Sequence, residues 1–341
     1  MIGSTVLQAV GRAQRSEESD TEAPTDIKHA LSERLRLQPD LLPPGSRVLV
    51  ALSGGPDSTA LIHLVAQLSP LHGWDVQAAH YEHQIRPDGE RETAVLAARM
   101  RSLGVELRIG RPTEPLPPAH APMRQARYSW LAETAAAIGA DRIATGHNQD
   151  DQVETVLFRL MRGTGNRGLA GIPVRRGPIV RPLLAISAAD IRCWLGQAGI
   201  EAFDDPSNRD PRWARNRVRH QLLPALEEHT GRDVRRRLLA IQSAAESVEE
   251  ASNRIVRSAL ATATGDDSDV LDRGAVLAWP PPLLAEILRH ACRERGVRLT
   301  RGAALGAAAG LGSLDSGQGL DLGCTLRIER SFDRLVFRSE P

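Results

Sequence analysis

Residues 47–58 read Arg-Val-Leu-Val-Ala-Leu-Ser-Gly-Gly-Pro-Asp-Ser. The first six form a short apolar run containing β-branched side chains, which is typical of a buried strand. The glycine pair after them suits a tight turn. Residues 58–68 then have the apolar spacing of a helix. The stretch therefore predicts a strand, a glycine-rich loop and a helix in direct succession.

The loop between this strand and this helix has the chemistry of an anion site. Gly54 and Gly55 let backbone N–H groups turn inward and approach a ligand closely. The N-terminus of the helix adds partial positive charge, and Ser53 and Ser58 add hydroxyl donors. We expect this loop to bind phosphate.

The basic residues restrict which phosphate chemistry the loop can perform. The chain has 43 lysines and arginines, and Lys28 is the only lysine. A Walker A loop needs a lysine beside its glycines, and a Schiff-base enzyme needs one in a pocket. Lys28 lies in neither setting, so both classes are excluded. The loop suits a pyrophosphate leaving group better than transfer of a γ-phosphoryl group.

Cysteine usage and hydropathy restrict the class further. Cys193, Cys292 and Cys324 are far apart and include no C-x-x-C pair, which argues against a disulfide framework and a zinc site. The first residues lack the pattern of a secretory signal, and no apolar run is long enough to cross a bilayer. We expect a soluble cytoplasmic protein.

Strands and helices alternate through the first half of the chain. The expected strands are 47–52, 76–81, 105–109 and 142–145, and the expected helices are 58–68, 90–103, 124–138 and 151–161. Such alternation predicts an α/β fold, a Rossmann-like parallel sheet covered on both faces. Sheets of this kind bind ligands beyond the carboxyl ends of their strands.

The second half has a different pattern. Residues 187–261 are almost wholly helical in pattern, and 280–295 predict another helix begun by prolines. Short strands are expected at 321–328 and 334–337. We therefore divide the chain into a mobile tail (1–26), an α/β domain (27–228) and a smaller, mostly helical domain (229–341).

Two segments concentrate positive charge although the net charge is only +1. Residues 159–181 contain six arginines and no acid, and residues 209–237 contain nine arginines against four acids. Both segments contain loop signals and neighbouring motifs, which favours a phosphate-rich partner. The alternative is a pair of solvated faces.

The segment after the fourth expected strand reads Gly146-His-Asn-Gln-Asp-Asp-Gln-Val-Glu-Thr155. Asp150 and Asp151 could face a hard cation that accompanies a triphosphate, and Glu154 lies one helical turn beyond them. Capping of the helix is the alternative role for these acids. His147 could stabilise a phosphate or move a proton.

The loop Ser53-Gly-Gly-Pro-Asp-Ser58 resembles the signature S-G-G-x-D-S of the PP-loop ATP pyrophosphatases. This resemblance implies the adenine nucleotide alpha hydrolase-like fold and cleavage between the α and β phosphates of ATP. An adenylated acceptor would be the intermediate. Members that transfer sulfur use cysteine pairs or an iron–sulfur cluster, and amidotransferases carry a glutaminase domain. Neither feature is evident here.

The remaining motifs resemble the tRNA(Ile)-lysidine synthase family. They are Ala79-His-Tyr-Glu-His-Gln-Ile-Arg86, Arg124-Gln-Ala-Arg-Tyr128, the block 145–171, Asp205-Pro-Ser-Asn208, Arg215-Asn-Arg-Val-Arg219 and Leu223-Pro-Ala-Leu226. Two positions depart from the family pattern: Glu82 replaces an Asp or Asn, and His120 replaces an acid.

The resemblance implies a reaction and its participants. ATP, with Mg²⁺, would adenylate the wobble cytidine of a tRNA(Ile) with a CAU anticodon. The ε-amine of L-lysine would then displace AMP to give lysidine. The α/β domain would be catalytic, and the smaller domain would bind tRNA or substrate. The sequence leaves a homodimer open. A cytidine thiolase without its own cluster and an inactive nucleotide- or tRNA-binding protein remain alternatives.

The resemblance and the residue chemistry together assign expected roles. The catalytic candidates are Asp57, His147, Asp151, Arg162 and Arg215. The nucleotide-binding candidates are Ala51, Ser53, Gly54, Gly55, Pro56, Asp57, Ser58 and His80. The candidates for binding tRNA or lysine are Glu82, Arg124, Arg127, Glu154, Asn208, Asn216, Arg219, Arg235, Arg236 and Arg237. The candidate metal ligands are Asp150 and Asp151.

Overall fold

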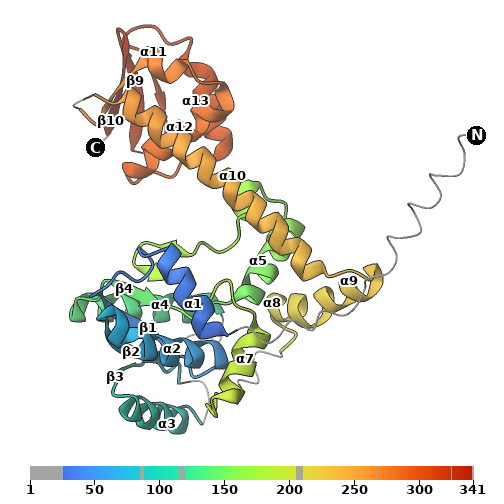
Figure 1. The fold of residues 1–341 in the computed structure, drawn as a ribbon. Coiled ribbons are helices and arrows are strands. Elements are labelled where there is room, and N and C mark those ends of the chain that lie inside the picture. Colours follow the sequence, from blue (N-terminus) through green and yellow to red (C-terminus); the bar gives the residue numbers. More distant parts are fainter. Residues whose placement is uncertain are drawn as a thin grey trace, which may run out of the picture. The chain divides into compact units, whose positions relative to one another are not determined.

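The computed structural model describes residues 26–84, 88–114, 120–204, 210–265, 267–323 and 325–339. It confirms the predicted parallel α/β sheet with a second, smaller region (Figure 1). The expected tail lies outside the described residues except for Asp26.

The larger sheet has six strands in the order β3-β2-β1-β4-β6-β5. Its strands are β1 (Arg47–Ala51), β2 (Asp75–Tyr81), β3 (Glu106–Gly110), β4 (Arg142–Ala144), β5 (Arg175–Arg176) and β6 (Ile179–Val180). Only the edge strand β5 pairs antiparallel. The chain runs outward from β1 to β3 and then returns to β4 on the other side of β1. The point at which the order reverses, between β1 and β4, is where such sheets bind ligands.

Alternating side chains of β1 explain how helices cover both faces of this sheet. Leu49 packs in one core with Leu131 of α4 (His120–Ile138). Val48 and Val50 lie in another core with Leu61 of α2 (Pro56–His72). The second core also takes residues from α1 (Ile27–Leu37), α3 (Gly89–Ser102) and α7 (Ala188–Gln197). All three β1 side chains are fully buried, as expected for a central parallel strand.

Further helices come after β4, two of them before the short strands β5 and β6. They are α5 (Gln149–Met161), α6 (Asn166–Leu169), α8 (Ala214–Arg217), a π-helical turn η3 (Val218–Leu222) and α9 (Leu223–Thr230). The predicted helices of the first half are all present, with ends displaced by a few residues. The range 187–261 is less helical than expected, because 198–204 and 210–213 form no helix.

The chain divides into two compact units, Met1–Arg162 with Gly171–Leu239, and Gly163–Ala170 with Ala240–Pro341. The division falls within the 30-residue helix α10 (Val234–Ala263). The predicted boundary at 228/229, with catalysis in the first domain and binding of tRNA or substrate in the second, stays a prediction. No helix among the described residues is both long and apolar enough to cross a membrane.

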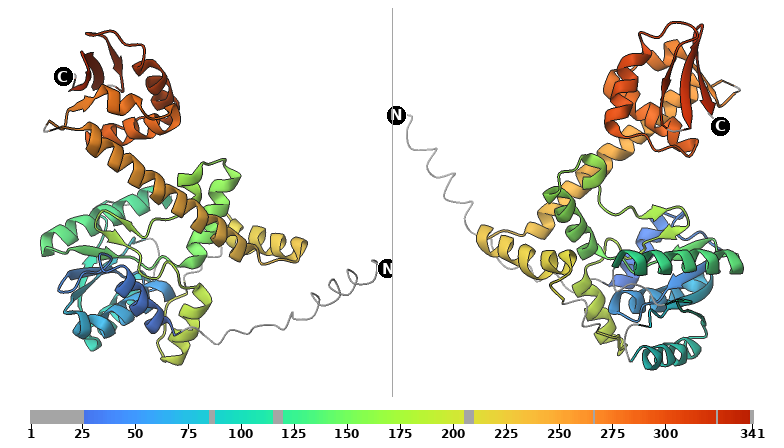
Figure 2. Two further views of the ribbon diagram at one scale, coloured as in Figure 1. Left: turned by 45° about the horizontal axis from the view of Figure 1, so that its top comes forward. Right: turned by 180° about the vertical axis from the view of Figure 1, so that it is seen from behind.

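The second unit contains an antiparallel sheet in the order β7-β10-β9-β8, seen from behind in the right view of Figure 2. The elements after α10, in chain order and including the strands of this sheet, are β7 (Val270–Asp272), α11 (Arg273–Leu277), α12 (Pro281–Glu294), α13 (Arg301–Leu311), β8 (Gly319–Asp321), β9 (Leu326–Ser331) and β10 (Arg334–Ser339). The expected strand 321–328 is wrong as one element, because β8 ends at Asp321 and β9 begins at Leu326. The α12 prolines stand in its first turn, as predicted.

Candidate active site

The loop from Leu52 to Gly55 connects β1 to α2, as the sequence predicts. Gly54 has a left-handed backbone, with φ of +86°. Phe203 covers this glycine: its backbone N–H donates to the Gly54 carbonyl at 2.9 Å. A Cβ on Gly54 would lie 2.5 Å from the Phe203 ring. The glycine is therefore required both by the turn and by the close packing above it.

Two serine hydroxyls hold the loop in shape. Ser58 Oγ donates to the Gly55 carbonyl at 3.1 Å and accepts from the Ser53 backbone N–H at 3.1 Å. The Ser53 hydroxyl lies 3.0 Å from the same oxygen. Ser58 is buried, whereas Ser53 is exposed. The exposed Ser53 hydroxyl is thus the one that can also reach an incoming anion.

The β4–α5 loop meets the phosphate loop at Gly146. A Cβ at this position would lie 2.9 Å from the Asp57 carbonyl carbon and from the Ser58 backbone nitrogen. Only glycine permits this approach without displacement of one loop. The contact brings the beginning of α5 beside the beginning of α2, at the point where the strand order reverses.

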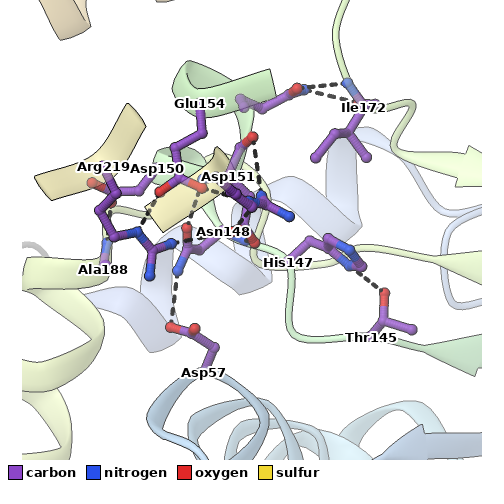
Figure 3. Close-up of polar contacts among 12 residues, drawn as sticks. Asp57, Thr145, His147, Asn148, Asp150, Asp151, Glu154, Ile172, Ala188 and Arg219 are labelled. Carbon is purple, nitrogen blue, oxygen red and sulfur yellow. Dashed lines mark hydrogen bonds and ion pairs between the residues drawn. The ribbon is translucent and has the colours of Figure 1, made fainter. Parts of the chain in front are cut away.

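Asn148 fastens these two helix beginnings together. Its side chain caps α5 by accepting from the Asp151 N–H at 3.1 Å, while the Asp151 carboxylate accepts from the Asn148 N–H at 3.0 Å. The Asn148 amide also donates to Asp57 Oδ1 at 2.9 Å (Figure 3). Burial raises the pKa of Asp57, and the negative charge of Asp151 adds to this effect.

Arginines from α8 and η3 neutralise the acids of α5. Glu154 is 1% exposed and accepts from Arg215 Nε at 2.5 Å and from Arg219 Nε. Arg215 also pairs with Asp151, with Nη2 2.8 Å from Oδ1. The predicted residues Asp151, Glu154, Arg215 and Arg219 therefore form one network, of which Figure 3 labels Asp151, Glu154 and Arg219.

Asp150 is occupied differently. One oxygen accepts from the Ala188 backbone N–H at 2.8 Å, and the other lies 2.9 Å from Arg235 Nη1. Arg235 also approaches Glu227 at 3.5 Å. Among the described residues there is no group of three or more side chains able to hold a metal ion. Asp150 thus joins α5 to α7 and α10 rather than facing the phosphate loop.

His147 follows β4 and lies among arginines. Its Nδ1 is 2.9 Å from Thr145 Oγ1, which also lies 3.3 Å from the Val180 carbonyl. Burial and the positive charges of Arg181, Arg124, Arg215 and Arg127 lower the pKa of His147 to about 3. The ring is therefore neutral near pH 7, so in the free protein it offers a lone pair or one N–H.

Several other predicted residues have different positions. Arg162 ends α5 and stacks over the Phe158 ring at 4.5 Å. It is eleven residues from Asp151, about 16 Å along the helix axis. Asn216 donates to the Asp210 carbonyl at 2.9 Å, and Arg236 and Arg237 are exposed. Asn208 and Arg86 lie outside the described residues.

The end of β2 provides two buried polar residues from the predicted set. His80 Nδ1 lies 2.9 Å from the Leu52 carbonyl, so this nitrogen carries a proton and donates. Glu82 pairs with Arg111, with Oε2 2.7 Å from Nε. Burial lowers the pKa of His80. His80 therefore supports the strand that ends in the phosphate loop.

Three residues near this site were not among the predicted ones. Asn148 is not among the predicted residues, although an Asn before an acidic first turn is a capping signal. Phe203 covers Gly54 from a distant segment, which no local pattern reveals. Arg181 was counted only as charge, yet it is 5% exposed.

Comparison with known proteins agrees with this geometry. A model described as PP-loop domain matches residues 22–226, and the chain is a PP-loop protein. The solved U34-tRNA thiolase NcsA from Methanococcus maripaludis has the same fold, with a TM-score of 0.54 and 17% identity over 66% of this chain and 80% of that one.

Curated relatives define the family more narrowly. The tRNA(Ile)-lysidine synthase of Salinispora tropica is 37% identical over 80% of this chain and 81% of its own length. That of Symbiobacterium thermophilum is 35% identical over 88% of this chain and 67% of its own. That of Parasynechococcus marenigrum is 33% identical over 84% and 89%. The chain belongs to the tRNA(Ile)-lysidine synthase family, which confirms the resemblance drawn from its motifs.

Replacing Gly54 by alanine tests the packing of the phosphate loop. Gly54→Ala adds both left-handed strain and a clash with Phe203, whereas Gly104→Ala adds only the strain, since nothing lies within 4 Å of its Cβ position. We expect urea unfolding to show a loss of about 1–2 kcal/mol for Gly104→Ala and a larger loss for Gly54→Ala. Equal losses would contradict the importance of the Phe203 contact.

Replacing Asp57 by asparagine tests its burial. Because the folded pKa of Asp57 lies above its ordinary value of 3.8, its charge disfavours the fold above the folded pKa. We expect Asp57→Asn to raise the free energy of unfolding at pH 7, and this gain should shrink as the pH falls toward 3.8. In denaturant titrations, the exposed control Glu133→Gln should change the free energy of unfolding by no more than about 0.5 kcal/mol.

Proposed function

We propose that this protein adenylates the wobble cytidine of a tRNA(Ile) with a CAU anticodon and joins it to L-lysine, releasing AMP and diphosphate. The observation that carries the proposal is the lysine-free loop Ser53–Ser58, set against the acid–arginine network of α5 in a member of this family. A cytoplasmic location, where tRNA is modified, is part of the proposal.

The phosphate loop serves the first step. Backbone N–H groups at the beginning of the 17-residue helix α2 and the Ser53 hydroxyl would hold the β and γ phosphates of ATP. The cytidine oxygen at C2 attacks the α phosphorus, and the bond to the β phosphate breaks. Diphosphate leaves into the loop. Because no γ-phosphoryl group is transferred, the loop needs no lysine to contact one.

The acids at this site fit a magnesium ion only in part. Asp57 and Asp151 suit one, because the raised pKa of Asp57 reflects buried negative charge beside Asp151 that a cation would relieve. Asp150 does not, because its contacts with the Ala188 N–H and with Arg235 direct it toward α7 and α10 rather than toward the phosphate loop. When bound, magnesium would neutralise charge on the ATP phosphates. We therefore assign the proposed metal site to Asp57 and Asp151, and no longer to Asp150.

Adenylation is needed because an oxygen bonded to C2 of cytosine leaves poorly. As part of AMP the same oxygen leaves readily when the lysine ε-amine attacks C2. The lysine nitrogen loses protons as it bonds to C2. The bond from C2 to the former cytosine oxygen breaks, and this oxygen leaves as part of AMP. A donor placed at the phosphate oxygens in this step contributes on the order of 3 kcal/mol.

The α5 network is the proposed place for lysine. An ammonium group can bind Asp151 or Glu154 only by competing with Arg215 and Arg219, which occupy these acids in the free protein. A guanidinium released by lysine would then be available to the phosphate of the adenylate. Arginine suits both positions, because its guanidinium group can form two parallel hydrogen bonds to a carboxylate or to a phosphate.

Mass analysis of the tRNA tests the function directly. After incubation with ATP and labelled lysine, tRNA(Ile) should gain the mass of one lysine less one water. Sulfur incorporation without lysine would establish the thiolase alternative instead. Absence of tRNA-dependent exchange between ATP and diphosphate would show an inactive binding protein.

Two arginines of one segment provide a matched test of the network. Arg215 bridges Asp151 and Glu154, whereas Arg212 pairs only with Asp210 in an exposed position. We expect Arg215→Gln to lower turnover at saturating tRNA at least about tenfold, the effect of roughly 1.4 kcal/mol. Arg212→Gln should stay within about twofold of the parent. Equal turnover in both variants would remove Arg215 from the reaction.

A further inference from the structure

Three arginines converge on one tyrosine near the carboxyl ends of β4 and β6. Arg124 and Arg127, on α4, lie over the Tyr128 ring at 4.7 and 5.4 Å. Arg124 Nη2 also lies 3.4 Å from the Tyr128 hydroxyl. Arg181, directly after β6, lies near enough to interact electrostatically with Tyr128 and with Arg124. Two separate parts of the catalytic unit therefore bring their guanidinium groups together.

These guanidinium groups have no carboxylate partner among the described residues. Arg181 is 5% exposed, and its Nη1 donates to the Pro173 carbonyl at 2.7 Å. The Nε atoms of Arg127 and Arg181 are shielded from solvent and have no hydrogen-bond partner. Arg124 is exposed and Arg127 is half-buried, whereas Arg181 is buried. A buried cation is almost always paired, because removing it from water costs the fold free energy. The three arginines thus lack a counter-ion.

The surroundings add more positive charge. In addition to burial, the positive charges of Arg124 and Arg176 lower the pKa of Arg181. The charges of the arginines around His147 likewise add to burial in lowering its pKa; they are Arg181, Arg124, Arg215 and Arg127. Burial and the positive charge of Arg127 lower the pKa of His83, which follows β2. The Nδ1 atom of His83 is buried without a hydrogen-bond partner. By contrast, the arginines of the α5 network all have acids beside them. The site is therefore divided into a neutralised part and a part with excess positive charge.

We propose that Arg124, Arg127 and Arg181 form a binding site for a phosphodiester of the RNA strand beside the nucleotide that reacts. This inference rests on the proposed function. Three guanidinium groups around a phenol hydroxyl present several N–H and O–H donors to the oxygens of one phosphate. The phosphate supplies the counter-ion that the described residues lack.

Aromatic neighbours favour RNA over the α phosphate of ATP as the source of this phosphate. The Tyr81 ring lies 5.0 Å from His83 and 5.5 Å from Trp130, so an aromatic group lies next to the charged one. Proteins recognise unpaired RNA by combining arginines for the backbone with aromatic rings for the bases. The ATP phosphates already have the loop after β1.

Glutamine replacement of Arg181 separates the two sources of phosphate. The probes are ATP alone and an RNA stem-loop with the CAU anticodon, each titrated against the full chain at several salt concentrations. We expect Arg181→Gln to weaken the RNA at least about tenfold and to reduce the salt slope by roughly one phosphate contact. ATP affinity should stay within about twofold, as should both affinities of the exposed control Arg101→Gln, which lies outside both basic segments.

Thermal unfolding with inorganic phosphate shows whether Arg181 binds an anion or serves the fold. Because Arg181 is buried without an acid, we expect Arg181→Gln to melt no lower than the parent in the absence of phosphate. Added phosphate should raise the melting temperature of the parent more than that of the variant. Arg127→Gln provides a second variant with the same expected result.

The outcomes are distinct. Loss of ATP affinity with unchanged RNA affinity would overturn the assignment to RNA, and unchanged affinity for both would overturn the site. A lower melting temperature in both variants, with no change in phosphate response, would show a structural role and also overturn it. Loss of RNA affinity in Arg181→Gln would support the site even if no lysidine is formed.

Discussion

The contact between Gly146 and the backbone of Asp57 and Ser58 is the constraint on which the site depends. Two loops that follow different strands can come this close only because one of them has no side chain there: a Cβ on Gly146 would lie 2.9 Å from the other. Asn148 then crosses the gap to Asp57, and the first turn of α5 delivers Asp151 and Glu154 beside the phosphate loop. Without this approach, the same acids and hydroxyls would belong to two separate loops.

Charge is arranged around this contact in two ways. On the α5 side, each acid is matched by arginines of α8, η3 or α10, so ammonium and guanidinium groups can exchange there. On the α4 and β6 side, arginines stand without acids among the described residues. The first arrangement suits an amino acid that carries both charges, and the second suits a polyanion.

Local patterns in the sequence predicted the parallel sheet and the phosphate loop well. Strand β1 and the glycine pair have strong signals, because burial on both faces and left-handed turns restrict the residue types severely. The short hairpin of β5 and β6 and the glycine- and alanine-rich helix α13 were missed, since neither has a clear apolar period. The strand at 321–328 was wrong because a turn after Asp321 interrupts an apolar run.

The site residues were predictable where chemistry and spacing agreed. Asp57, Asp151 and Glu154 share one network because they flank adjacent helix beginnings, which the motif spacing indicated. Asp150 has the same residue type and neighbourhood, yet its side chain points toward Ala188. Phe203 and Arg181 reach the site from distant segments, and tertiary packing alone places them.

His147 gains a property from its arginine neighbours. Burial is the main cause of its pKa of about 3, and the positive charges of the nearby arginines lower this pKa further. An anion seated among them would cancel part of the repulsion, so the pKa of His147 would rise and the ring would become a better proton acceptor. By linkage, a proton on His147 would in turn strengthen anion binding. Protonation of His147 and binding of an anion beside it would therefore favour each other.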